Sequence, residues 1–108
     1  MTDLNRSALV LKGALELWRD DPKRWCQWEL SRCARGRGVY LNSRYAVSWC
    51  AAGAVVASGR SFIGLPIRSI LDMGDVSIGE WNDAPGRTFV EVRDRFTAYF
   101  GLCAIQGG

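Results

Sequence analysis

The feature that most constrains the fold is an apolar run in the middle of the chain. Residues 46–57 include one polar side chain, that of Ser48. A helix that is apolar on every side is a buried helix, and this run is too short to cross a bilayer, which takes about 20 residues. We therefore predict a buried central helix over residues 44–59, with a cap from residues 42–43 at its start and Gly59 at its end.

Length and composition place the chain among ordinary globular proteins. Its 108 residues predict a single domain over residues 1–108, large enough to bury a self-sufficient core. Apolar residues make up 48% of the chain and charged residues 23%, which is typical of folded domains. Because the N-terminus is polar and the first apolar run is amphipathic, we expect no secretory signal, no membrane segment and a cytoplasmic location.

The reactive side chains are few. Histidine is absent, and the four cysteines show no C-x-x-C pair. The lack of His excludes Ser–His–Asp and Cys–His catalysis and removes the commonest zinc ligand, while the irregular thiol spacing argues against a Cys₄ zinc site. We expect no cofactor, no metal and no disulfide, and the sequence leans toward a non-enzymatic role.

Cys50 has two interpretations. Placement early in a helix would lower the pKa of its thiol, as in a cysteine nucleophile. Without a His to act as base, a buried core residue is the favoured interpretation.

Amphipathic helices are predicted near both ends of the chain. Over residues 3–19, apolar side chains recur about every 3.5 positions and form one stripe, and the segment 20–22 ends this helix at a proline. Thr88 and Glu91 form a T-x-x-E capping box that begins the last helix. Its apolar face is expected to carry Phe89, Val92, Phe96, Tyr99 and Cys103.

Shorter elements fill the space between these helices. Residues 24–41 contain two short β-rich segments around a glycine-containing turn, which predicts a β-hairpin. Residues 61–74 suit a short helix, with Pro66 at its first position and Gly74 at its stop, whereas residues 75–87 have no helical period and are predicted to be a loop. The expected fold class is mostly α (α+β): three to four helices around a buried central helix, with one short β-hairpin.

The most distinctive stretch is W-N-D-A-P-G-R-T at residues 81–88. Pro-Gly suits a type II turn, Asn82 and Asp83 can bond the turning backbone, and Arg87 can fold back on Asp83. On the structural interpretation, Trp81 enters the core and the polar residues satisfy the loop. On the functional one, Asn82, Asp83 and Arg87 form a site for a small anion or nucleotide beside a helix N-terminus.

A second candidate region is basic. Residues 32–44 contain four arginines and no acid, whereas residues 72–83 contain four acids and no base, so a basic and an acidic face are expected. Such Gly-Arg loops are mostly solvated turns, yet Trp25, Trp28 and Tyr40 lie nearby and can contact a partner protein or stack on bases. The candidate partner-binding residues are Arg32, Arg35, Arg37 and Arg44.

Two motifs carry a resemblance. W-C-x-x-G-A at residues 49–54 and W-N-D-x-P-G-R-T at residues 81–88 resemble a small single-domain family of unknown function found in bacteria and their phages. The resemblance covers most of the chain and implies no catalytic role. The phage association implies an accessory protein, which would block a host defence complex or sequester a signalling nucleotide.

Three functions are therefore open. The first is a non-enzymatic binding module, such as a phage-type inhibitor that acts on a host protein complex through the hairpin arginines. The second is a small-ligand site at Asn82, Asp83 and Arg87, binding an anion or nucleotide. The third is a nucleic-acid-binding protein that uses the basic hairpin, and it predicts a steep salt dependence.

Overall fold

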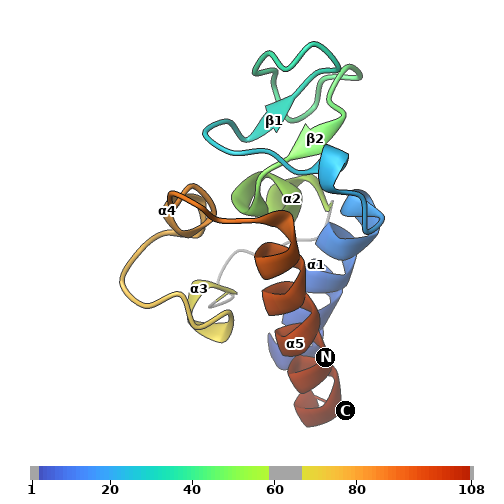
Figure 1. Ribbon diagram of the computed structural model, residues 1–108. Coiled ribbons are helices and arrows are strands. Elements are labelled where there is room, and N and C mark those ends of the chain that lie inside the picture. The colour runs from blue at the N-terminus through green and yellow to red at the C-terminus, as the bar shows by residue number, and fades with distance from the viewer. Residues whose placement is uncertain (1–2, 59–66, 108) are drawn as a thin grey trace.

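The computed structural model describes residues 3–58 and 67–107 of the protein (Figure 1). The predicted fold class is confirmed, because helices dominate and two strands form a small antiparallel sheet. Within these described ranges, no helix is both long enough and apolar enough to cross a membrane. In chain order the elements are α1 (Asp3–Trp18), the 3-10 helix η1 (Pro22–Arg24), β1 (Ser31–Arg32), β2 (Ser48–Trp49), α2 (Ala51–Ala57), α3 (Ile67–Ile70), α4 (Ile78–Asn82) and α5 (Phe89–Gly107).

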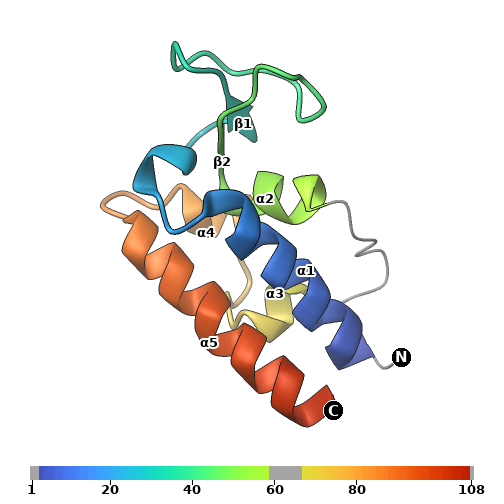
Figure 2. The ribbon, with the colours of Figure 1, turned by 90° about the vertical axis from the view of Figure 1, so that its right-hand side faces the viewer.

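The helices α1 and α5 lie side by side and share the most extensive contact between elements (Figures 1 and 2). At its centre, Trp18 is fully buried and meets Phe89 and Phe96 edge-on, with ring centroids 5.8 Å and 5.0 Å away. Its indole Nε1 donates a hydrogen bond of 2.9 Å to the carbonyl of Trp49. One side chain therefore joins α1, α5 and β2.

Both predicted end helices are confirmed. In α5 the capping box forms in both directions, because the Glu91 amide donates to Thr88 Oγ1 at 3.2 Å and the Thr88 amide donates to Glu91 Oε1 at 3.2 Å. The predicted apolar face of α5 is buried except for Tyr99, which is half-buried. After α1, Arg19 and Asp20 have left-handed φ values of 53° and 54°.

The predicted central helix is wrong at its start. Residues 44–50 precede the helix, and α2 begins at Ala51. Cys50 caps it, because its Sγ accepts a hydrogen bond from the Gly53 amide at 3.3 Å, so residues 42–43 do not. The preceding apolar residues join β2 instead, and Gly59 lies outside the described residues.

The burial expected of the central helix is confirmed for four residues of α2, whereas Val56 is 44% exposed. The buried residues are Ala51, Gly53, Ala54 and Val55. A Cβ placed on Gly53 would lie 2.0 Å from the carbonyl oxygen of Leu30. This glycine therefore lets the chain before β1 lie directly on the helix.

The sheet differs from the predicted hairpin in its second strand. The glycine-containing turn forms, but β1 pairs with β2, with Ser31 opposite Trp49 and Arg32 opposite Ser48. The segment that was predicted to pair with the first strand, residues 39–41, comes directly after Gly38, which forms only an isolated bridge with Arg32. Tyr40 in that segment is 85% exposed, so β2 offers the more buried apolar surface to β1.

The short helix predicted within residues 61–74 is present as α3. Ile67 and Leu71 are buried, and Gly74 has the left-handed φ of 68° that suits the predicted stop. Pro66 lies outside the described residues.

The loop predicted over residues 75–87 is wrong over residues 78–82, which form α4. Ser77 caps α4 by accepting a hydrogen bond from the Glu80 amide at 3.1 Å. This S-x-x-E pair is the same signal as the capping box of α5. A helix of five residues is too short to show an apolar period. The capping signal is therefore the one sequence feature that could have predicted α4.

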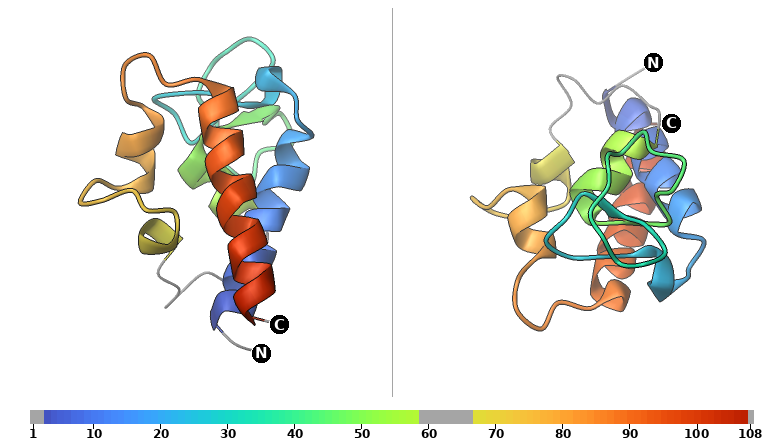
Figure 3. Two further views of the ribbon diagram at one scale, coloured as in Figure 1. Left: turned by 60° about the horizontal axis from the view of Figure 1, so that its bottom comes forward. Right: turned by 90° about the horizontal axis from the view of Figure 1, so that it is seen from above.

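The molecule has two structurally different regions. The helical body comprises α1, α2, α3, α4 and α5. Residues 27–47, here called the loop lobe, project from one end of this body, opposite the first turn of α1 and the last turn of α5 (Figures 1 and 3).

Candidate partner-binding site

Asn82 at the end of α4 fixes the base of the loop lobe. Its side chain is fully buried. Its Oδ1 accepts hydrogen bonds from Trp25 Nε1 at 2.6 Å and from the Ala51 amide at 2.9 Å. Its Nδ2 donates to the carbonyl of Cys26 and to Asp83 Oδ1, both at 3.0 Å. The amide thus fills its two acceptor and two donor positions with groups of the protein itself.

The residues around Asn82 add further bonds to the start of the lobe. Asp83 Oδ1 also accepts from the Trp28 amide at 2.8 Å. Gln27 Nε2 donates to the carbonyls of Asn82 and Ala84 at 2.9 Å and 3.3 Å. The W-N-D segment therefore holds residues 25–28 in place.

Arg87 does not fold back on Asp83, so that prediction is wrong. Its Nε donates to the Trp81 carbonyl at 2.9 Å, its Nη1 bonds Glu91 at 2.8 Å, and its guanidinium lies 4.1 Å from the centre of the Trp81 ring. The hydrogen bond from Arg87 lowers the pKa of the Glu91 carboxyl. Arg87 thus stabilises the entry to α5, away from the bonds that Asn82 and Asp83 make.

The four candidate arginines of the lobe divide into two kinds. Arg32 is half-buried and donates to the carbonyls of Gly36 at 2.6 Å and Gln27 at 2.9 Å. Arg44 lies on the ring of Tyr45, 4.9 Å from its centre. Arg35 and Arg37 are exposed, and within the described residues their guanidinium groups make no hydrogen bond or ion pair. These last two are free to meet a partner.

The tip of the lobe is a tight turn around Cys33. The Cys33 amide donates to the Arg37 carbonyl at 2.9 Å, and Gly36 adopts a left-handed φ of 79°. Backbone amides of Arg35 and Arg37 lower the pKa of the partly exposed Cys33 thiol. This thiol is the most easily ionised of the four.

The other three thiols behave as core residues. Burial raises the pKa of Cys26, Cys50 and Cys103. At Cys50, burial raises the pKa by more than the hydrogen bond from the Gly53 amide lowers it. The lowered pKa considered for a nucleophilic Cys50 is therefore wrong, and its interpretation as a buried core residue is confirmed. All four cysteines are free in the structure.

Large apolar side chains are exposed on the lobe. Trp28 is 69% exposed and Tyr40 is 85% exposed, whereas Trp25 is half-buried with its Nε1 bound to Asn82. Leu30, Tyr45 and Val47 add to this surface. Their exposure was not predicted, because Leu30 was expected in the hairpin and Tyr45 and Val47 in the central helix. An open groove of about 730 Å³ runs beside Leu30, Val39, Tyr40 and Leu41.

The net charge of the whole chain resides in this lobe. Residues 27–47 contain four arginines and one acid, Glu29, which leaves ten basic and ten acidic residues elsewhere in the chain. The carboxylate of Glu29 lies against Gly38, where an added Cβ would come within 2.5 Å of its carboxyl carbon. The predicted basic face is therefore one end of the molecule.

Comparisons with protein-family models, with curated proteins and with solved structures give no match. The resemblance to a bacterial and phage family therefore stays a prediction. Over residues 3–58 and 67–107, no three Cys, Asp or Glu side chains gather in an arrangement that could hold a metal ion.

Proposed function

We propose that the protein is a non-enzymatic binding module that docks its loop lobe on an acidic surface of a protein complex. The free guanidinium groups of Arg35 and Arg37 attract carboxylates and speed encounter. Trp28 and Tyr40 supply rigid aromatic contact area. Tryptophan, tyrosine and arginine are the residue types that most often dominate binding energy at protein interfaces.

Trp28 is the single observation that carries this proposal. A side chain of this size is 69% exposed although its backbone has a left-handed φ of 68°, which disfavours a non-glycine residue by about 1–2 kcal/mol. Asp83 holds that backbone by accepting the Trp28 amide. Trp28 is strained and exposed, and its backbone is held by Asp83, so it is pre-organised for contact with a partner.

The resemblance to the phage family extends the proposal to the identity of the complex. On that basis the target belongs to a bacterial defence system, and binding of the lobe inhibits it. The four free thiols support action in a reducing compartment such as the cytoplasm.

Affinity capture from bacterial lysate, followed by native mass spectrometry, tests the proposal. The test bait carries Arg35→Glu and Arg37→Glu, and the matched control carries Lys23→Glu and Arg68→Glu, two exposed cations outside the lobe. Both baits change the net charge equally. We expect a stoichiometric protein partner on the wild-type and control baits and none on the lobe variant.

A second variant separates binding from folding. Trp28→Gly removes the aromatic contact and relieves the left-handed backbone, so we expect a stable protein that does not capture the partner. Retention of the partner by both lobe variants, or capture of no stoichiometric partner at all, overturns the proposal. Loss of capture after nuclease treatment assigns the lobe to nucleic acid instead.

A further inference from the structure

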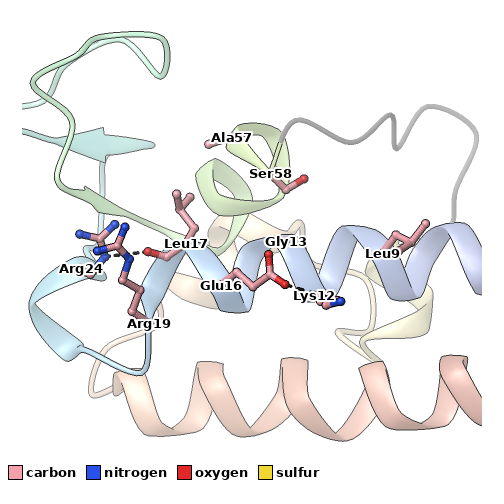
Figure 4. A pocket seen from close by; sticks show the side chains of 9 residues that line it. All are labelled: Leu9, Lys12, Gly13, Glu16, Leu17, Arg19, Arg24, Ala57 and Ser58. Carbon is pink, nitrogen blue, oxygen red and sulfur yellow. Dashed lines mark hydrogen bonds and ion pairs between the residues drawn. The ribbon is translucent and has the colours of Figure 1, made fainter.

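A separate cavity lies on the helical body, between the last turns of α1 and the end of α2 (Figure 4). Its volume is about 280 Å³. Leu9, Leu17 and Ala57 line part of it. The polar lining includes three cations, Lys12, Arg19 and Arg24, and one carboxylate, Glu16.

The charges around this cavity are unbalanced. Glu16 pairs with Lys12 at 3.8 Å, and the carboxylates that follow α1 are engaged elsewhere, Asp20 with Arg93 at 2.8 Å and Asp21 with the Lys23 amide at 2.9 Å. Two guanidinium groups, those of Arg19 and Arg24, therefore face the cavity without a carboxylate partner among the described residues.

Arg24 is held in a defined position. Its Nε donates to the Leu17 carbonyl at 2.7 Å, and its guanidinium carbon lies 5.2 Å from the centre of the Trp49 ring. The bond to Leu17 offsets the partial negative charge at the end of α1 and leaves the Nη groups as donors. Figure 4 shows the guanidinium of Arg19 at the same end of the cavity.

We infer that this cavity binds a phosphate group, free or as a small monoester, between Arg19 and Arg24. A guanidinium presents paired N–H donors that match phosphate oxygens. The apolar lining and the volume leave room for a small substituent on the phosphate. The site is distinct from the loop lobe and does not depend on the function proposed for it.

Arg19 allows a variant that removes the cation without harming the fold. Its backbone has a left-handed φ of 53°, a conformation that glycine adopts readily. We therefore expect Arg19→Gly to melt at a temperature at least as high as that of the wild type. Arg68→Gln, which removes one exposed cation outside both the cavity and the loop lobe, is the matched control.

The test is a titration of the full chain with inorganic phosphate and with phenyl phosphate, by calorimetry and thermal unfolding. At a phosphate concentration ten times the Kd, we expect Tm to rise by about 5 °C in wild type and in Arg68→Gln. Arg19→Gly should weaken binding roughly tenfold or more, as loss of a charge-assisted paired contact does. Tighter binding of phenyl phosphate identifies a monoester site, and equal binding identifies a site for free phosphate.

Two results overturn the inference. One is the absence of saturable phosphate binding to wild type. The other is equal phosphate affinity in wild type and Arg19→Gly, because general stabilisation by a kosmotropic salt acts on every variant alike.

Discussion

The helical body and the loop lobe are stabilised in opposite ways. In the body, Leu11, Trp18 and Phe96 are fully buried and exclude water along the α1–α5 contact. In the lobe, the strand β1 is two residues long and the turns are fixed by polar groups such as Arg32, while the large side chains Trp28 and Tyr40 face solvent. Apolar burial is non-directional, whereas a few hydrogen bonds fix one particular loop shape. The lobe can therefore expose aromatics without collapsing onto them.

Removal of core volume should have the largest effect. Phe96→Ala takes away a fully buried ring that packs on Trp18, and we expect the free energy of unfolding to fall by about 4 kcal/mol. Urea denaturation followed by far-UV circular dichroism measures this loss. A decrease below about 1 kcal/mol would mean that the α1–α5 contact is not the main source of stability.

Asn82→Ala should be almost as damaging, although it removes no apolar contact. The substitution leaves Trp25 Nε1, the Ala51 amide and the Cys26 carbonyl without their partner, and unsatisfied buried polar groups cost about 1–3 kcal/mol each. We expect a loss of about 3 kcal/mol by urea denaturation. Asp83→Ala, which removes a half-buried acceptor, is the control at about 1 kcal/mol; equal losses in both variants would refute the special role of Asn82.

Arg32→Ala should separate the two regions further, because it should destabilise the loop lobe and leave the helical body unchanged. Without the bonds to Gly36 and Gln27, the amides of Cys33 and Val39 should exchange with deuterium at least about tenfold faster. The amides of α5 should exchange at the wild-type rate. Faster exchange throughout both regions would show that the lobe and the body unfold as one unit.

Cys33 offers the mildest test, with no expected change in stability. Because backbone amides lower the pKa of its thiol, the reactive thiolate is present at lower pH than in a free cysteine. Iodoacetamide at neutral pH should alkylate Cys33 before Cys26, Cys50 or Cys103, and peptide mass spectrometry identifies the site. The rate should fall as the pH drops through this lowered pKa. Preferential alkylation of a buried thiol would contradict the tight turn at the tip.

The body was largely predictable because its two long helices carry their own signals. The apolar stripe of α1 and the capping box of α5 are local patterns, and both appear in the structure. The start of α2 was not predictable, because an apolar run does not distinguish a strand from a helix. The extended conformation at Trp49 is fixed by residues that are distant in the chain, because the Trp18 indole and the Cys26 amide both donate hydrogen bonds to the Trp49 carbonyl.

The candidate site was predictable in composition but not in geometry. The arginine excess marks the lobe, and the exposure of Arg35 and Arg37 follows from their place in a glycine turn. The hydrogen bonds from the Arg32 side chain to the carbonyls of Gly36 and Gln27 correspond to no recognisable sequence pattern. The partners of Asn82 include the side chain of Trp25, 57 positions away in the chain, and such a pairing becomes visible only once the helices are packed.

The placement of the lobe opposite the first turn of α1 and the last turn of α5 has a practical consequence (Figures 1 and 2). A tether attached at either of these helix ends points away from Trp28 and Arg35. The protein can therefore be anchored to a sensor surface, a bead or a carrier domain by either end with its lobe directed outward, and both orientations of a fusion should present the same contact surface.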